Sequence, residues 1–545
     1  MPFPGQSAVK TYKFPYFTGG LSTNPSKPTE CAQFDNFDVR RDGYSQTRQS
    51  TFLINTTTAI GTSMCVGLYR TSIASESNPA AMLIVAKTGT TFYSTPILGS
   101  YLNTATFSMP LNHLPLSFTS FTVPTSPGDS PVYFESMLDA NFAPKVYMVN
   151  PNFGGVLLWD PSNPSGSASV ISGSPANPYL IVEFSGRLFV VTTASPNVIQ
   201  FSNPADPSTW SSTDKFQIAS KWGPIVALMS QDDKLYIFTT TAILYMTGDP
   251  TAPYVGVMHP YITTVSQSTI SQFGPLCMFA GRDNNIYSLA GSVNLTSDPI
   301  RGEMFGGTYL GNGANTTNAW GALTPFYYFL RAPLNTSSSP ASPTKGSVTT
   351  FTMVYERERF GYWGRYVYPT NSGLGQSDPY QAIVCYIPEW QAVLLPNGIG
   401  DIYLQPLMNS NYPPNTQPAV PQDYGLTALT PVPVLSVLNT MMFEGEDDKF
   451  ITKLFRRGMI TGSGDLLGIS LYLYTNSDTP TVIDPTIYRN SLPTQWELPG
   501  IDGSSSSASL EFNMIQIIIS GTNLILRGML YDYTLQRYNI IQPDQ

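Results

Sequence analysis

The stretch that decides the fold is KLYIFTTTAILYMTGD, residues 234–249, in which two apolar runs at 235–238 and 243–246 flank three threonines and an alanine. β-Branched and aromatic side chains lose rotamer freedom in a helix, and residues 239–241 add three threonines in a row. The pattern therefore predicts two short strands joined by a tight connection. Neither run alternates apolar with polar residues, so we expect both faces of each strand to be buried.

The same pair of apolar runs recurs along the chain. Further copies begin near residues 82, 146, 188, 276, 351 and 383, and the spacings between 146 and 276 are about 42, 47 and 41 residues. This period is that of a four-stranded β-propeller blade, in which neighbouring blades cover both faces of a strand. We predict an all-β chain with a propeller of six blades, give or take one. A series of β-sandwiches is the alternative.

Composition agrees with many short strands and turns. Only 12% of the 545 residues are charged, about half the usual ~25%, and the chain holds 43 Gly and 47 Pro. The chain has a net charge of −9 and therefore lacks the excess of Lys and Arg that is typical of proteins that bind nucleic acid. The four cysteines, Cys31, Cys65, Cys277 and Cys385, form no CxxC pair, so scattered free thiols are expected rather than a metal site or a disulfide framework.

The chain is expected to divide into four parts. Residues 1–60 are a turn-rich N-terminal docking segment leading into the propeller, and 61–404 form the propeller, with a long insertion at about 291–349. Residues 405–432 are a Pro-rich linker, and 433–545 form a C-terminal β-sandwich-like domain. The N-terminus has no signal-peptide pattern, and no apolar run approaches the ~20 residues of a membrane-spanning helix.

The residues argue against catalysis. His113 and His259 lie far from any nucleophile signature, and the acidic run FEGEDDKF, residues 443–450, lacks a closing ligand for calcium. The segment FSNPADPSTW, residues 201–210, fails as a sialidase-type Asp box, so Asp206 is expected to bond the backbone of its own turn. We predict no catalytic residue, no cofactor and no metal.

The N-terminal stretch FTGGLSTNPSKPTECAQFDNFDVRRDGYSQTRQS resembles the opening of the tail nozzle (tail tubular protein B-like) proteins of short-tailed bacteriophages, with Asn36, Asp38 and Arg48 at matching positions. Ser22 and the pair at 49–50 depart from that pattern.

The centre, from GRLFVV to LYMTGD, is similar in order and spacing to the central blades of the same family. Five residues hold the positions of its blade motif: Ser202, Asp206, Trp210, Leu235 and Tyr236. The ending, from KLFRRGMITG to LRGMLYDYTLQRY, also resembles the family's closing β domain.

This resemblance implies a structural virion protein of the tail, assembled in the host cytoplasm as a homohexameric ring. Such a ring contacts the tail adaptor and the tail fibres or spikes. It continues the conduit for double-stranded DNA, holds the genome and then allows its ejection, without catalysis. A DNA-channel lining of acidic or neutral residues would let phosphates pass, but the sequence does not identify those residues. The alternatives are a receptor-binding tail spike and a carbohydrate-binding propeller module.

An aromatic alternation near the N-terminus, Tyr12, Phe14 and Tyr16, is expected to serve assembly. We predict that this segment docks on a neighbouring subunit or on the adaptor by strand addition. Docking on the chain's own propeller is the alternative.

Overall fold

The computed structural model describes residues 116–296 without a break. The rest of the chain is described in shorter stretches: 9–14, 20–21, 30–39, 45–47, 51–54, 60–71, 81–97, 319–325, 327–333, 348–356, 359–366, 368, 383–398, 400–407, 422–424, 431–433, 435–440, 453–474, 481–483, 488–489, 495–498, 511–512 and 514–535. No helix within these stretches has the length and apolar character needed to cross a membrane.

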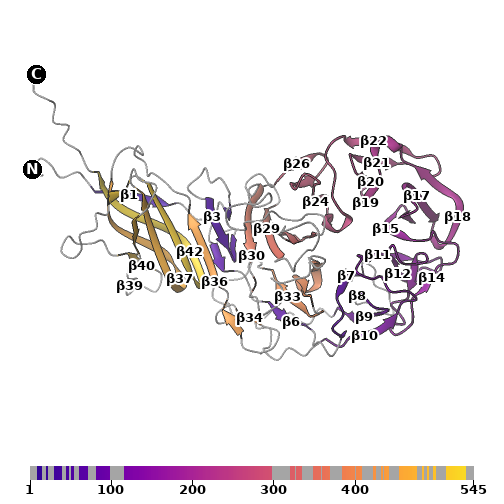
Figure 1. Cartoon of the computed structure of the whole chain (residues 1–545), viewed down its shortest axis with the longest axis horizontal. Helices are drawn as coiled ribbons and strands as arrows, with labels where there is room; N and C mark the ends of the chain where they lie inside the picture. The colour runs from indigo at the N-terminus through magenta and orange to yellow at the C-terminus, as the bar shows by residue number, and fades with distance from the viewer. Residues whose placement is uncertain are drawn as a thin grey trace, which may run out of the picture.

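Six four-stranded antiparallel sheets and a seventh four-stranded antiparallel unit, which is one end of a 16-stranded sheet, follow one another round a ring (Figure 1). The first four blades are β7 Cys65–Arg70, β8 Met82–Lys87, β9 Thr91–Pro96 and β10 Thr119–Thr122; β11 Tyr133–Leu138, β12 Pro144–Val149, β13 Leu157–Trp159 and β14 Ser169–Val170; β15 Pro178–Phe184, β16 Arg187–Thr192, β17 Ser195–Asn203 and β18 Asp206–Gln217; β19 Ile225–Gln231, β20 Lys234–Thr239, β21 Ile243–Thr247 and β22 Tyr254–His259. The other three are β23 Ser271–Phe273, β24 Leu276–Ala280, β25 Ile286–Leu289 and β26 Val293–Leu295; β27 Trp320–Leu323, β28 Tyr327–Pro333, β29 Val348–Glu356 and β30 Arg359–Tyr366; β31 Cys385–Ile387, β32 Ala392–Pro396, β33 Ile402–Pro406 and β6 Phe52–Leu53. The fold is therefore a β-propeller.

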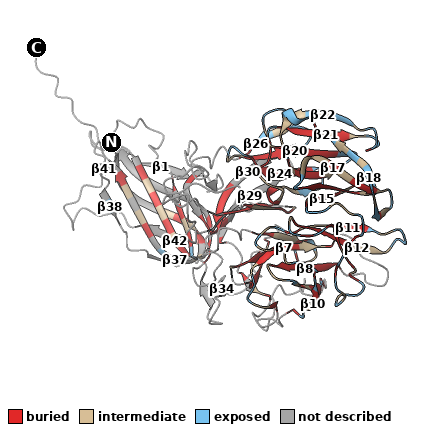
Figure 2. Ribbon diagram, turned by 45° about the vertical axis from the view of Figure 1, so that its right-hand side comes forward, coloured by how far each residue is buried: buried red, intermediate tan, exposed pale blue. Residues whose placement is uncertain are grey.

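The structure of blade four explains why its apolar runs do not alternate with polar residues. Leu235 and Ile237 point into a core shared with blade three, whereas Tyr236 and Phe238 point into a core shared with blade five. Leu235, Ile237 and Phe238 are 0% exposed. Both faces of the strand are thus covered by neighbouring sheets, as the sequence predicted, and Figure 2 shows the resulting buried bands across the blades.

The ring closes at blade seven, where the outer strand comes from the N-terminal part of the chain. Strand β6 pairs with β33, and Leu53 lies opposite Tyr403. At the seam with blade one, the buried Lys87 ammonium donates to the carbonyl oxygens of Ser63 at 2.9 Å and Gly400 at 3.1 Å. The seam thus combines a borrowed strand with a buried polar contact.

The blade count is seven, within the predicted range of six blades give or take one, and the predicted insertion is part of the propeller. Residues 291–349 contain β26, β27 and β28 and the first residues of β29, so this region supplies blade strands. The apolar pair predicted near residue 351 is β29 and β30 of blade six. Strands β27 and β28 fall in the predicted insertion because Gly-, Asn-, Ser- and Pro-rich stretches separate them from that pair.

The remaining strands of the 16-stranded sheet form what we call the second sheet. It is built round two strands of 22 residues each, β37 Lys453–Tyr474 and β42 Met514–Leu535. The pairing of β37 with β42 shifts register at several points, and the two halves recruit different neighbours. The half nearer the propeller contains β36 Leu435–Thr440 and β3 Glu30–Asp35. Strand β38 Thr481–Ile483 pairs with the edge of β37 opposite to β42.

The other half of the second sheet contains 453–461 of β37 and 525–535 of β42, together with β1 Val9–Phe14, β39 Tyr488–Arg489, β40 Gln495–Leu498 and β41 Glu511–Phe512. We call it the far half-sheet, because in Figure 1 it lies on the side away from the propeller. In the predicted linker, residues 405–406 are the end of β33, and β34 Gln422–Tyr424 forms a hairpin with β35 Pro431–Pro433. Strands β2 Gly20–Leu21, β4 Phe37–Val39 and β5 Ser45–Thr47 also join the second sheet. Most described residues of the predicted N-terminal docking segment are therefore strands of this sheet.

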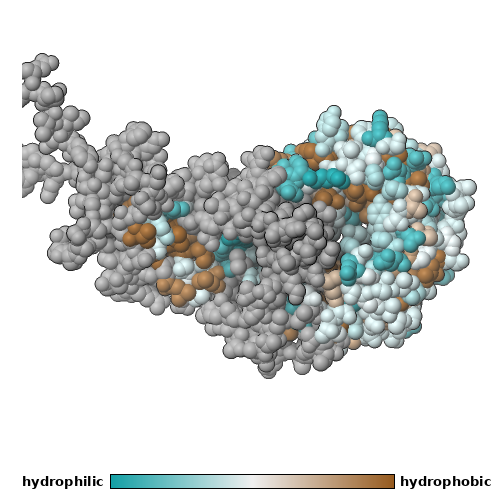
Figure 3. All heavy atoms as spheres, in the orientation of Figure 1, coloured by the Kyte–Doolittle hydropathy of each residue, from teal (hydrophilic) through white to brown (hydrophobic). Residues whose placement is uncertain are grey.

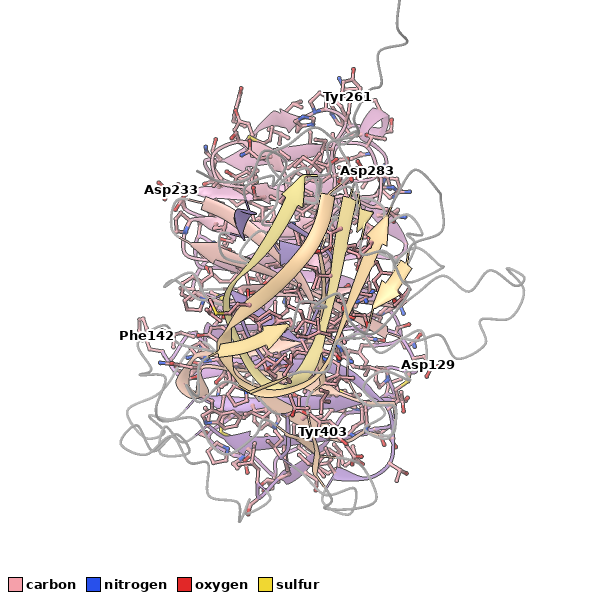
Figure 4. All side chains as sticks on the ribbon, turned by 90° about the vertical axis from the view of Figure 1, so that its left-hand side faces the viewer. Asp129, Phe142, Asp233, Tyr261, Asp283 and Tyr403 are labelled. Carbon is pink, nitrogen blue, oxygen red and sulfur yellow. The ribbon has the colours of Figure 1, made fainter. Side chains whose placement is uncertain are left out.

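The propeller has two faces that differ in which turns they carry. In a meander of four strands, the turns between strands one and two and between strands three and four lie at one end, which we call face 1. The remaining turns lie at the other end, face 2. Figure 4 shows the propeller edge-on with Phe142 and Asp233 of face 1 on one side, and Asp129, Tyr261 and Asp283 of face 2 on the other.

Candidate functional site: a buried polar junction and a filled propeller axis

A buried ion pair joins blade six to the second sheet. Asp35 ends β3 and Arg365 lies in β30, and the two strands meet in parallel at this one residue pair. Arg365 donates through Nε to Oδ1 of Asp35 at 2.7 Å and through Nη2 to Oδ2 at 2.9 Å. The side chains are only 8% and 7% exposed. A planar guanidinium on a carboxylate fixes orientation as well as distance, so the pair sets how the two sheets meet.

Asn36 continues the junction with its backbone and its side chain. Its φ of 60° is in the left-handed region, which asparagine tolerates better than most residues. Its backbone N–H donates to the carbonyl of Arg365 at 2.8 Å, and its Nδ2 donates to the carbonyl of Leu435 at 2.7 Å. Ser436 then donates to the carbonyl of Asn36 at 3.1 Å. Segments near residues 36, 365 and 435 are thereby tied together.

Thr47 extends this network to the long strand β42. The hydroxyl of Ser436 lies 2.9 Å from the hydroxyl of Thr47, which accepts from the backbone N–H of Leu524 at 2.9 Å. All of these polar groups are buried, and each has a partner, so the junction avoids the cost of unsatisfied polar atoms. The arrangement is a mechanical coupling; it contains no group placed to perform chemistry.

The residues predicted for assembly fall into three groups. Asn36 lies in the junction, and Asp38 lies in β4, opposite Gln46 of β5. Strand β1 pairs antiparallel with β42, with Tyr12 opposite Tyr531 and Phe14 opposite Met529. Tyr16 and Arg48 lie outside the described residues.

The strand addition made by β1 is thus within the chain. It places β1 in the second sheet and not on the propeller, because β42 extends far enough to offer its edge to β1.

Ser202, Asp206 and Trp210 are structural parts of blade three. Ser202 is 0% exposed, and its hydroxyl accepts from the backbone N–H of Leu188 at 3.0 Å. The Asp206 carboxylate accepts from the backbone N–H of Ser208 at 3.2 Å, which confirms the predicted turn. The indole of Trp210 donates to the carbonyl of Pro207 at 3.0 Å.

The Asp206 turn is one of three equivalent turns that the sequence analysis did not recognise as a repeat. Asp-Pro-Ser or Asp-Pro-Thr begins at 160, 206 and 249, each time after the third strand of a blade. In each copy the carboxylate accepts from the backbone N–H and the hydroxyl two residues on. These hydrogen bonds hold the pKa of Asp206 and Asp249 below the ordinary value. The repeated tripeptide at a spacing of about 45 residues was the signal.

The propeller axis is filled by side chains that meet across it. Tyr133 of blade two stacks on Trp320 of blade six with ring centroids 6.2 Å apart, and Phe273 of blade five contacts Tyr386 of blade seven at 6.5 Å. Non-adjacent blades therefore touch through their innermost strands. Desolvation by this packing raises the pKa of Tyr133.

Glu135 is a half-buried carboxyl on an innermost strand. It accepts from the backbone N–H of Ser136 at 3.1 Å and of Glu183 at 3.3 Å. Burial outweighs these bonds and raises its pKa to about 7, and the nearby Glu183 carboxylate acts in the same direction. We expect this group to titrate near neutral pH.

Catalytic and metal chemistry find no constellation among the described residues. His259 caps a turn, with Nδ1 accepting from the backbone N–H of Ile262 at 3.0 Å. No cluster of three or more His, Cys, Asp or Glu that could hold a metal occurs in the described part of the chain. All four cysteines are free thiols. His113 and the acidic run at 443–450 lie outside the described residues.

Comparisons with known proteins add little beyond these observations. No protein-family model and no curated protein sequence matches the chain. Among solved structures, the Pan2 WD40 domain of Neurospora crassa aligns with 68% of this chain and 98% of its own, at a TM-score of 0.38 and 7% identity. YCF48 bound to D1 peptide aligns with 66% and 96%, at 0.36 and 11%, and the computationally designed Ika8 protein with 66% and 100%, at 0.32 and 8%. The propeller assignment follows from the sheet topology itself.

Proposed function

We propose that this protein is a structural subunit of a virion tail, of the nozzle type found in short-tailed bacteriophages. In this role six copies form a ring below the tail adaptor, in contact with the tail fibres or spikes. The ring continues the conduit for double-stranded DNA, retains the genome and then lets it pass. The chain is not an enzyme in this account.

The observation that carries the proposal is the coupling of the propeller to the second sheet through a buried, fully bonded junction. The pair formed by Asp35 and Arg365 joins segments 330 residues apart in the chain. Such a junction gives little net stability compared with apolar packing, but it fixes one orientation. A subunit that must hold its place in a ring under load needs a fixed relation between its parts.

The filled axis supports a particular form of this role. Rings 6.2 Å apart across the axis leave no passage for a DNA duplex through one propeller. A conduit would therefore be enclosed between several copies, outside each propeller. The resemblance of the opening, the central blades and the closing β domain to nozzle proteins, in that order, supports the same role.

The proposal is tested by imaging the purified full chain by negative-stain electron microscopy and by weighing its assemblies by native mass spectrometry. We expect rings of six copies with a central lumen. Gold-labelled antibody should then mark the tail axis of virus particles. Trimers, or label on peripheral appendages, would contradict the nozzle role and favour a spike.

A further inference from the structure

Phe142 is an exposed aromatic residue held in a conformation that disfavours it. Its side chain is 79% exposed, and its φ is 60°. A bulky residue in the left-handed region is an outlier, and such strain is often found at functional positions. Equivalent turns of blades three and four place Ser185 and Asp232 at positive φ, residues that are smaller or better suited to it.

The turn that carries Phe142 is rigid. The backbone N–H of Phe142 donates to the carbonyl of Asp139 at 2.9 Å, and the Asp139 carboxylate accepts from the backbone N–H of Asn141 at 2.8 Å and of Ala143 at 2.9 Å. The ring is therefore presented on a fixed support, which lowers the ordering cost of an aromatic binding anchor.

The surroundings of Phe142 on face 1 are acidic. The face 1 turns of blades two to four, with the two residues on either side, hold seven carboxylates and three cations, a formal charge of −4: Asp139, Asp160, Glu183, Asp206, Asp232, Asp233 and Asp249 against Lys145, Arg187 and Lys234. The corresponding face 2 turns of the same blades, with the turn that enters blade two, hold two charged residues of opposite sign, Asp129 and Lys221. Figure 3 looks onto face 2, where pale spheres predominate and separate teal and brown groups are scattered among them. The acidic character thus belongs to the face that presents Phe142.

The far half-sheet carries the opposite charge. Its strands hold seven cations and three carboxylates, a formal charge of +4: Lys10, Lys13, Lys453, Arg456, Arg457, Arg489 and Arg527 against Glu497, Glu511 and Asp532. Two of the cations, Lys10 and Lys13, lie on β1, which pairs on one side with β42. One chain therefore carries two regions of equal and opposite formal charge at different places.

We propose that face 1 of blades two to four, with Phe142 as its anchor, docks on the far half-sheet of a second copy of this chain. Charge complementarity selects this occupant, since like-charged regions of two copies would repel. The two surfaces differ, so the contact is head-to-tail, and a head-to-tail contact closes into a ring when its rotation allows. The inference rests on the proposed ring and names its subunit interface.

The test measures self-association of the full chain by sedimentation velocity at two salt concentrations. Charge interactions are weakly screened at about 50 mM salt and strongly screened at about 500 mM. The main variant is Phe142→Gly, which relieves the backbone strain while removing the ring. We expect its Kd to be weaker by about 30-fold, as for an aromatic hot spot, with an unfolding temperature no lower than that of the wild type. Tyr261→Ala, at an 88% exposed aromatic on face 2, is the matched control and should leave association unchanged.

Charge variants test the partner surface. Asp233→Lys on face 1 and the double variant Lys10→Glu, Lys13→Glu on β1 should each weaken association at low salt, with the difference shrinking at high salt. Asp129→Lys on face 2 is the control. If Phe142→Gly or the β1 double variant associates as strongly as the wild type, the inference is overturned. Rings that form normally in all variants would overturn this interface alone, whereas a wild type that stays monomeric would overturn both the interface and the proposed function.

Discussion

The seam between blades and the junction at blade six bury their residues by opposite chemistries. In blade four, apolar side chains such as Ile237 and Phe238 fill both seams and are 0% exposed. At the junction, Asp35 and Arg365 are nearly as buried, but they are charged and are joined by directional hydrogen bonds. Apolar packing tolerates small changes of shape, whereas a buried ion pair requires one geometry. The seams therefore supply stability, and the junction supplies orientation.

The largest effect is expected from Asp35→Ala, which leaves the Arg365 guanidinium buried without its carboxylate. Breaking a buried pair costs about 3–5 kcal/mol of unfolding free energy. Urea unfolding followed by hydrogen exchange should show loss at β3 and β36 first. Asp129→Ala, at an exposed aspartate, is the control and should stay close to wild type.

The double variant Asp35→Leu, Arg365→Met sharpens the comparison. If the junction supplies orientation rather than stability, this apolar pair should recover most of the lost free energy but leave a broader range of arrangements of the two sheets. Small-angle scattering of the two variants and the wild type would report it. A double variant as unstable as Asp35→Ala would show that the pair itself stabilises the fold.

Ile237→Ala probes the apolar side of the comparison. The side chain is 0% exposed, and its removal should cost about 2–5 kcal/mol through lost burial and a residual cavity. The orientation of the second sheet should not change. Val255→Ala on the exposed outer strand of the same blade is the control, with an expected change within about 0.5 kcal/mol. A similar loss in both variants would contradict the double-sided burial.

Asp206→Ala should have a smaller effect, about 0.5–1.5 kcal/mol, because it removes the acceptor of one turn. Asp206→Asn should retain most of the stability that the turn contributes. The pKa of Asp206 is held low by the Ser208 hydroxyl, so this contribution is present above the unfolded-state pKa and disappears as the pH falls through the folded-state pKa. Chemical unfolding of both variants at neutral and acidic pH measures it. An equal loss in the Asn variant would indicate that the turn depends on charge and not on the acceptor.

Glu135→Gln should chiefly change how steeply the stability of the fold depends on pH. The folded-state pKa of Glu135 is raised to about 7, so its charged form is disfavoured, and the folded chain loses stability as the pH rises from the unfolded pKa to about 7. The Gln variant should show a flatter dependence of the urea midpoint between pH 5 and pH 8. Parallel curves for the two proteins would contradict the assignment. Glu183 is the one charged neighbour that acts on this group, and Glu183→Gln should shift the transition to lower pH.

The blades could be predicted because their signal is local. Seven pairs of apolar runs were visible, and seven blades exist. In blades one to five the visible pair is the second and third strands, as in β20 and β21, because these are covered on both faces. The innermost strands face the axis and the outermost face solvent, so their patterns are mixed. The inner strands of blade six, β27 and β28, were not predicted, because Gly- and Pro-rich stretches separate them from the visible pair of that blade.

The junction could not be predicted in the same way. Asp35 and Arg365 are 330 residues apart, and neither lies in a periodic pattern. The single hint is an arginine within the aromatic stretch GYWGRYVY, where a charge needs a buried partner. The nozzle-like opening pointed to Asn36 but not to its neighbour. A contact between strands that are distant in the sequence has no local sequence pattern. A pair of residues in direct contact can therefore go unpredicted although whole blades are predicted.

The most direct test of the account is the hydrogen-exchange rate of the Asn36 amide, which donates to the carbonyl of Arg365 at 2.8 Å. If the propeller and the second sheet form one rigid unit, this amide should exchange as slowly as that of Ile237 in the core of blade four, through unfolding of the whole structure. Exchange orders of magnitude faster at Asn36 than at Ile237 would mean that the junction opens independently, and would contradict the rigid coupling on which the proposed role depends.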